Sequence, residues 1–423
     1  MLRNTRIGVC VAWTATLICG TCFTSAAQAE VGTLVRSAAP DWPQWRGPRR
    51  DGISDETGLL PSWPAGGPKR LWTASEIGNG YSSPIVVEGT LYVTGDQGDD
   101  LIITAFSTDG SLRWRSANGA AWQRSYPGAR SSCTYDDGKL YHMNAHGRVA
   151  CLDATSGREV WAVNVLERFE AKNITWGISE SLLVHGNHVF VTPAGAKGLM
   201  AALDKRTGAT VWATPPISGE QASYGSPILI AVGQRRLLVN SGAQYAFAVD
   251  AADGRLCWQM RHLDPKNTIT TTPILTNDRL VFTNSSRYFG GTYGVRFDGV
   301  PGDKAWSAKL KVAHGGLVCV DGHLCGASSR GDVTGWVTFD AATGTPVRLA
   351  ELPPGSLIYA DKRFYCLTQQ GTMTLQELTD KGFRTTGGFQ LAEGKDVWAH
   401  PVVCKGRLFL RYHDTLYCYD VRR

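Results

Sequence analysis

The sequence predicts an all-β protein, an eight-bladed β-propeller built from four-stranded antiparallel blades. Three observations predict it. A degenerate repeat ends in tryptophan, each copy follows two short apolar runs joined by a tight turn, and the last unit lacks a strand that occurs near the amino terminus. Repeats whose tryptophans recur at about 47 residues are typical of propellers and other repeat arrays. No helical period competes with this pattern.

The repeat is clearest in CLDATSGREVW (151–161), ALDKRTGATVW (202–212) and AVDAADGRLCW (248–258). Each copy has an apolar residue before Asp, then a polar turn closed by Gly, then Trp four residues after that Gly. The spacing predicts a third strand, a turn and an outer strand that carries the Trp.

The apolar runs ahead of each copy predict the inner two strands. In SPIVVEGTLYVTG (83–95) and HPVVCKGRLFLRY (400–412), β-branched and aromatic residues flank Glu-Gly and Lys-Gly turns that favour positive φ. Similar runs precede the other copies, so one unit has four strands. The blades are predicted to begin near Tyr81, Tyr126, Trp176, Tyr224, Thr268, His314, Gly355 and Trp398.

The eighth unit ends at Arg423 after three strands. Its fourth strand is predicted to be KRLWTAS, Lys69–Ser75, because pairing the two ends closes the ring and removes exposed sheet edges. The expected organisation is a signal peptide over 1–29, an extended amino-terminal clasp over 30–68 and the propeller over 69–423.

The first 29 residues have the pattern of a secretory signal. Arg3 and Arg6 precede a short apolar stretch, and Ala27-Gln28-Ala29 supplies small residues for cleavage. We expect cleavage near Ala29, a periplasmic or secreted protein, and no integral membrane span after the signal is removed. An amino-terminal membrane anchor is the alternative.

Charge and cysteine content narrow the function class. The formal charge of +6 falls to about +4 without the two signal arginines, too little for the dense basic surface of a nucleic-acid binder. No nucleic-acid partner is expected, and the chain is expected to be a monomer.

Most cysteines are predicted to be free and buried. An Asp321-Gly322 turn would place Cys319 opposite Leu324, so that Cys325 faces the other way.

The stretch DWPQWRGPRRDG (41–52) is predicted to be a structural clasp. Its prolines favour an extended run along the propeller surface outside any sheet. We expect Trp42 and Trp45 to bury against blade flanks, and its arginines to stack or cap carbonyls. These arginines are Arg46, Arg49 and Arg50. A recognition patch for an anionic polymer is the alternative, which a lone basic cluster supports poorly.

The ALDKRTGATVW-type units resemble the repeats of the pyrroloquinoline-quinone-like (PQQ-like) propeller superfamily over nearly the whole mature chain. The resemblance implies that the Gly and Trp of each repeat dock neighbouring blades. The docking tryptophans would be Trp72, Trp114, Trp161, Trp212, Trp258 and Trp306.

The superfamily contains quinone- and calcium-dependent alcohol dehydrogenases, and also proteins that bind no quinone, such as the propeller lipoprotein of the outer-membrane barrel-assembly machinery. This sequence has no adjacent cysteine pair and no CxxCH haem motif, and it is shorter than those dehydrogenases. Its acidic stretch GDQGDD (95–100) is predicted to be a solvated turn. No metal and no cofactor are therefore expected, and PQQ with calcium is the alternative.

Propeller geometry predicts where a ligand would bind. Loops between outer and next inner strands open on one face, so the starts of the inner strands converge on the mouth of the central channel. Their aromatic rings and hydrogen-bonding groups suit a planar or sugar-like ligand or a peptide segment. Alternatively, the rings stack on one another and plug the channel. The candidate ligand-binding residues are Tyr81, Ser82, Tyr126, Arg130, Trp176, Tyr224, Thr271, His314, Trp398 and His400.

The sequence favours a non-catalytic binding or scaffold propeller of the cell envelope, with an envelope protein or a small ligand as its partner. A divergent quinone-dependent alcohol or sugar dehydrogenase is the alternative, and a carbohydrate-active envelope enzyme is a second one. No catalytic residue is predicted, because the sequence contains neither a GxSxG nucleophile elbow nor an HExxH zinc motif.

Overall fold

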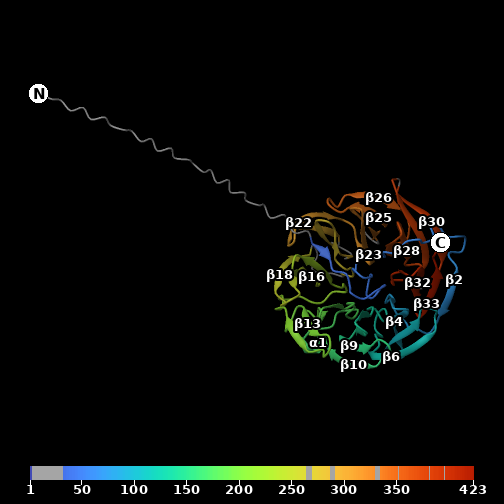
Figure 1. Ribbon diagram of the computed structural model, residues 1–423, viewed down its shortest axis with the longest axis horizontal. Helices are drawn as coiled ribbons and strands as arrows, with labels where there is room; N and C mark the ends of the chain where they lie inside the picture. The colour runs from blue at the N-terminus through green and yellow to red at the C-terminus, as the bar shows by residue number, and fades with distance from the viewer. Residues whose placement is uncertain are drawn as a thin grey trace.

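The computed structural model describes residue 1 and residues 32–262, 269–285, 291–328, 334–350, 352–380, 382–394 and 396–423. Over these residues, eight antiparallel sheets follow one another around a ring and form the round disc in Figure 1. The predicted all-β, eight-bladed propeller is confirmed. The predicted signal peptide after Met1, and Thr268, lie outside the described residues.

The first four blades each run from an inner strand to an outer strand. Blade 1 has β3 (Ile85–Val87), β4 (Thr90–Gln97), β5 (Asp100–Ser107) and β6 (Leu112–Ala120). Blade 2 has β7 (Thr134–Asp136), β8 (Lys139–Met143), β9 (Arg148–Asp153) and β10 (Glu159–Asn164), followed by the short helix α1 (Val165–Arg168). Blade 3 has β11 (Leu183–His185), β12 (His188–Val191), β13 (Ala201–Asp204) and β14 (Thr210–Ala213). Blade 4 has β15 (Ile228–Val232), β16 (Arg235–Ser241), β17 (Tyr245–Asp250) and β18 (Leu256–Arg261).

The second four blades repeat this order. Blade 5 has β19 (Ile274–Leu275), β20 (Arg279–Thr283), β21 (Thr292–Phe297) and β22 (Pro301–Ala308). Blade 6 has β23 (Val312–Val320), β24 (His323–Ser328), β25 (Gly335–Asp340) and β26 (Pro346–Ala350). Blade 7 has β27 (Gly355–Ala360), β28 (Arg363–Thr368), β29 (Thr372–Thr379) and β30 (Gly382–Gln390). Blade 8 has β31 (Val402–Cys404), β32 (Arg407–Tyr412), β33 (Thr415–Asp420) and, outermost, β2 (Arg70–Ala74).

The last blade closes as the sequence predicts. Strand β2 pairs antiparallel with β33, with Trp72 opposite Cys418. The Glu88-Gly89 and Lys405-Gly406 hairpin turns have the expected positive φ angles. The two ends of the chain therefore share one sheet, and the ring has no open seam.

The repeat tryptophans lie between adjacent blades. Trp114 of blade 1 donates its Nε1 hydrogen to the carbonyl of Ala154 in blade 2, and its ring lies over Gly157. A Cβ atom at Gly157 would lie 2.5 Å from that ring, and the φ of this residue is +72°. Only glycine fits both constraints without strain. Equivalent hydrogen bonds to a carbonyl of the next blade are donated by Trp72, Trp161, Trp258 and Trp306. The ring of Trp212 packs on Gly254 in the same way, but its Nε1 donates to no described residue.

Hydroxyl groups link the inner strands of consecutive blades. The amide of His400 donates to Ser83 Oγ, the amide of Ser83 to Ser132 Oγ, and the amide of Ser132 to Ser181 Oγ. The amide of Ser181 continues the series to Ser226 Oγ. These serines before the inner strands therefore hold five blades, from blade 8 to blade 4, together.

The eight cysteines that follow the predicted signal form no disulfide bond. Cys319 lies opposite Leu324 in the β23–β24 ladder, and Cys325 lies opposite Val318. The predicted register, which turns Cys319 and Cys325 to opposite faces of the sheet, is confirmed. Within the described ranges, no helix has the length and apolar character needed to cross a bilayer.

The amino-terminal segment lies inside the central channel, and the expectation that it runs along the propeller surface is wrong. Strand β1 (Thr33–Leu34) joins blade 4 as a fifth strand, next to the innermost strand β15. Trp42 then pairs with Val86 of β3. Its side chain is 2% exposed. Figure 1 shows this blue start of the described chain at the centre of the disc.

Residues 33–56, which we call the channel segment, contact the innermost strand of every blade or residues beside it. A short segment can contact all eight innermost strands only if it lies at the axis of the ring. Besides the contacts to blades 4 and 1, the partners are Tyr135 in blade 2, Ser181 and Leu182 in blade 3, Thr272 in blade 5, Leu317 in blade 6, Tyr359 in blade 7 and Val403 in blade 8. The prolines do prevent regular pairing, but several backbone amides of the segment, together with Arg46 and Arg50, donate to carbonyls of the inner strands or of residues beside them.

Candidate functional site at the channel mouth

Six of the predicted residues form one aromatic cluster at the mouth of the channel. Trp398 is central, with ring-centroid distances of 4.4 Å to Tyr81 and 4.2 Å to His314, both stacked. Tyr126 lies 5.3 Å from Trp398. Trp176 and Tyr224 extend the series from Tyr126. We call Tyr81, Tyr126, Trp176, Tyr224, His314 and Trp398 the mouth cluster.

Backbone bonds between blades hold the cluster. The amide of Tyr81 donates to the carbonyl of Ala129 at 2.7 Å, and the amide of Tyr224 donates to the carbonyl of Ile269 at 2.8 Å. The amide of Trp176 donates to the phenol oxygen of Tyr224. Five of the residues lie ahead of an inner strand and His314 lies near the start of β23, so the geometry of the ring brings their side chains together near the axis. Tyr126 is the most exposed member, at 50%.

Arg130 provides a cation beside the cluster. Its guanidinium donates to the carbonyls of Tyr126 at 2.7 Å and Gly128 at 2.9 Å, and it lies 5.3 Å from the centre of the Trp122 ring. Burial lowers the pKa of Arg130 to about 10, so the group keeps its charge at neutral pH. Cation–π contact with Trp122 fixes its position.

The other three predicted residues lie buried beneath the cluster. Ser82 bonds to the carbonyl of Thr94 and accepts from the buried guanidinium of Arg411. Thr271 Oγ1 donates to the carbonyl of Thr283 at 3.1 Å. His400 Nε2 lies 3.0 Å from the carbonyl oxygen of His314. These three side chains are buried and hydrogen-bonded in the interior, so they do not line the exposed mouth.

The channel below this layer is filled by the chain itself. The Trp45 ring meets the His400 ring edge-on at 4.6 Å, and Trp45 Nε1 donates to Thr272 Oγ1 at 3.0 Å. Arg46 is 2% exposed and bonds to the carbonyl of Leu317. The mouth is therefore a surface over a packed interior.

Ser131 and His142 resemble a nucleophile and its base, but their geometry is structural. Asn118 donates to His142 Nδ1, so Nε2 carries the hydrogen that points to Ser131 Oγ at 2.9 Å. The Ser131 hydroxyl in turn donates to the carbonyl of Met143. Both side chains are buried, and burial lowers the pKa of His142 to about 3. The histidine cannot accept the serine proton in this arrangement.

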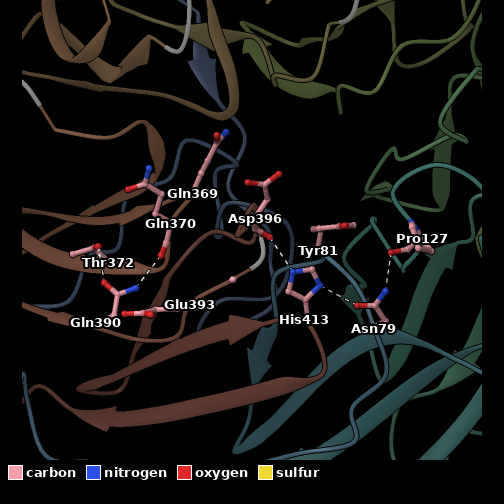
Figure 2. Close-up of a pocket in the computed structure, with 11 residues that line it drawn as sticks. Asn79, Tyr81, Pro127, Gln369, Gln370, Thr372, Gln390, Glu393, Asp396 and His413 are labelled. Carbon is pink, nitrogen blue, oxygen red and sulfur yellow. Dashed lines mark hydrogen bonds between the residues drawn. The ribbon is translucent and has the colours of Figure 1, made fainter.

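An open pocket of about 780 Å³ adjoins the mouth between blades 7, 8, 1 and 2 (Figure 2). Asn79 donates to the carbonyl of Pro127 at 2.8 Å, and its oxygen lies 3.0 Å from His413 Nδ1. His413 Nε2 lies 3.1 Å from the carbonyl oxygen of Asp396. Of these lining residues, only Tyr81 was among the sequence candidates. The rest come from loops without a repeat pattern, and the position of those loops on the mouth face was their one signal.

The ring of Gly–Trp-docked blades and its aromatic mouth define a PQQ-like β-propeller. A family model described as outer membrane protein assembly factor BamB matches residues 99–350, more than half of the chain. The chain belongs to this family.

Two curated relatives are similar over part of the chain. The outer membrane protein assembly factor BamB of Kangiella koreensis is 28% identical over 149 residues, which are 35% of this chain and 33% of that protein. The quinohemoprotein alcohol dehydrogenase ADH IIB of Pseudomonas putida is 26% identical over 153 residues, which are 33% of this chain and 22% of that protein. The matches thus span a third or less of these relatives' lengths.

Solved structures share the fold. BamB from Moraxella catarrhalis has a TM-score of 0.60 at 16% identity and covers 83% of this chain and 97% of its own. A europium-containing methanol dehydrogenase has a TM-score of 0.67 at 13% identity and covers 87% of this chain and 88% of its own. At this identity the likeness establishes the fold alone, since one fold hosts unrelated functions.

Proposed function

We propose that the chain is a non-catalytic binding propeller of the cell envelope that holds a segment of a partner protein on the mouth cluster. The observation that carries the proposal is a partly exposed aromatic cluster, with Arg130 beside it, over a channel filled by the chain's own residues. Tyr, Trp and Arg are the residues enriched where protein interfaces bind most strongly. Packed residues such as His400, Trp45 and Arg46 beneath the cluster keep such rings in place.

The arrangement of the rings argues against a quinone at this mouth. Trp398 already stacks on Tyr81 and His314, so a planar cofactor would have to displace one of them. Within the described ranges, no group of three or more His, Cys, Asp or Glu residues is placed to hold a metal ion. These features support a site without PQQ or calcium, and the dehydrogenase alternative gains nothing from them.

The envelope location rests on two supports. The first 29 residues have the pattern of a secretory signal, and relatives in the same family are described as outer membrane protein assembly factors. The chain would act as a monomer in the periplasm or outside the cell, with an envelope protein as its partner.

Photo-crosslinking in the native host tests the proposal. A photoreactive amino acid at Tyr126 should yield a discrete crosslinked product with an envelope protein, identified by mass spectrometry. The same group at Val211, which is 49% exposed on the outer strand β14, should not yield that product. Absence of a specific product at Tyr126, or dye-linked alcohol oxidation when purified protein receives PQQ and calcium, would contradict the proposal.

A further inference from the structure

The pocket in Figure 2 is separate from the mouth cluster except for Tyr81. Its volume of about 780 Å³ lies within the range of roughly 300–1,000 Å³ typical of small-molecule sites. Residues of blades 7 and 8 form one side of the pocket. Asn79 and Tyr81, which precede β3 of blade 1, lie on the other side. The partner-binding proposal leaves this pocket without a role.

Some of the described lining residues are held in place by hydrogen bonds to one another, and others have polar side chains that form no such bond. Thr372 donates to the oxygen of Gln390, whose nitrogen donates to the carbonyls of Gln370 and Ala392. On the other side, Asn79 is held between Pro127 and His413. Second-layer bonds of this kind fix the wall of a site before a ligand arrives.

Five polar groups on this wall form no side-chain hydrogen bond with another described residue. They are the amides of Gln369 and Gln370, the carboxylates of Glu393 and Asp396, and the hydroxyl of Tyr81. Figure 2 shows Gln370 on one side of the pocket, Tyr81 on the other and Asp396 between them. Burial raises the pKa of Tyr81, so its hydroxyl stays a donor at neutral pH.

The chemistry of these groups selects the ligand. Two carboxylates repel phosphate, sulfate and carboxylate ligands, and each can accept hydrogen bonds from paired hydroxyls. The primary amides both donate and accept. Among the described lining residues Pro127 is the one aliphatic side chain, so this part of the wall offers little to an apolar side chain. A hydroxyl-rich ligand without negative charge matches this wall.

A second pocket of about 470 Å³ shares Asn79 with the first and continues the groove between blades 8 and 1. Its walls add the carboxylates of Glu76, Asp96 and Asp414. One Asp96 oxygen accepts from the Trp122 amide at 2.9 Å, and the other is buried without a partner among the described residues. The second pocket therefore extends the polar wall with three carboxylates, the amide of Gln97 and one guanidinium, that of Arg115.

We propose that this groove, from Gln369 and Asp396 past Asn79 to Asp96, binds a neutral carbohydrate chain. The sugar hydroxyls donate to the carboxylates and exchange hydrogen bonds with the amides, while the ring of Tyr81, supported by Trp398, borders the chain. The role is binding, with no bond made or broken.

Titration calorimetry with the full mature chain tests the proposal. The probes are maltotriose, cellotriose and tri-N-acetylchitotriose, each at millimolar concentration. At least one should bind. Asp396→Ala and Gln370→Ala should each weaken that binding by about tenfold, the size expected for loss of one hydrogen bond involving a charged or well-placed group. Asp380→Ala removes an exposed carboxylate just after β29, outside both pockets, and should leave the affinity unchanged.

Three outcomes would overturn the proposal. None of the three sugars binds to folded protein, or a sugar binds equally well to the Asp396 and Gln370 variants, or pentalysine binds in the groove while the sugars do not. The last result would assign the groove to basic peptides. Tyr126→Ala should leave sugar binding intact, and Asp396→Ala should leave the Tyr126 crosslink intact, so the two proposals fail separately.

Discussion

The buried arginines of the channel segment are held by carbonyl oxygens. Arg50 donates to the carbonyls of Ser181 at 2.7 Å and Leu182 at 3.0 Å, and to Gln44 Oε1 at 3.2 Å. Burial lowers its pKa to about 9, so it remains charged at neutral pH. A guanidinium has five donors in a fixed fork, which suits it to several carbonyls at once.

Arg50→Met should therefore destabilise the protein more than the same change at Arg49. The first change leaves buried carbonyls without donors and should cost about 3 kcal/mol. Arg49 lies at the surface and pairs with Asp51 and Asp55, so its loss should cost about 1 kcal/mol or less. Denaturant unfolding of both variants measures the difference. An equal loss of unfolding free energy in the two variants would show that Arg50 does not hold the channel segment in place.

Three histidines are buried as neutral rings. Burial lowers the pKa of His142 and His400 to about 3 and that of His262 to about 4. In the unfolded chain each titrates near 6.5. Their contribution to stability is full above pH about 6.5 and is lost as the pH falls through the folded-state values, because the unfolded chain then binds more protons.

Three buried acids oppose this trend, and one of them is Glu220, whose pKa burial also raises. Burial raises the pKa of Glu180 to about 8 and that of Asp96 to about 6, so their contributions fall as the pH rises through these values. Burial also lowers the pKa of the partly buried His185. Near pH 5 the four histidines therefore outnumber the three acids, so the midpoint temperature should be lower at pH 5 than at pH 7. Scanning calorimetry at the two values measures it, and a higher midpoint at pH 5 would refute the assignment.

Sequence reasoning placed the mouth residues only in part. The repeat sets where each inner strand begins, and five of the six aromatic residues do lie ahead of those strands, whereas His314 lies within β23. Their role in ligand binding stays a prediction. Ser82 and His400 are close to mouth residues in sequence, but hydrogen bonds to Thr94, Arg411 and the carbonyl of His314 hold them in the interior. The groove residues Gln370 and Asp396 lie in loops, whose conformation no periodic pattern specifies.

Between blades, the stabilising element is the Gly–Trp contact. The tryptophan spacing made the four-strand unit and the ring closure predictable. The channel segment was not predictable in the same way, because its prolines indicate an extended chain but not the surface against which it lies. Its partners come from all eight blades, and such distant pairings leave no local pattern in the sequence.

Gly157→Ala tests the contact between blades 1 and 2. The new methyl group would overlap the Trp114 ring at 2.5 Å and also strain a backbone with φ of +72°. The control Gly138→Ala introduces the same backbone strain, at φ of +73°, with nothing within 4 Å of the methyl group. We expect Gly157→Ala to cost about 1–3 kcal/mol more, the usual cost of overpacking. Equal free energies of unfolding would contradict a tightly packed contact.

At the scale of the whole molecule, the chain both closes its ring and fills its axis. Strand β2 completes blade 8, while the channel segment reaches the inner strands of all eight blades. A ring with a packed axis presents its outer faces for binding, and the face with the mouth cluster and the groove carries the exposed aromatic and polar groups. This arrangement is the central claim on which both proposals rest.

Hydrogen exchange followed by mass spectrometry tests that claim most directly. The amides of Val35, Trp42, Gly52 and Ser54 donate to backbone carbonyls of inner strands or of the segment itself. Peptides covering residues 33–56 should therefore exchange as slowly as those covering the inner strands β7 and β15. Exchange of residues 33–56 within seconds, while the inner strands stay protected, would contradict a filled channel.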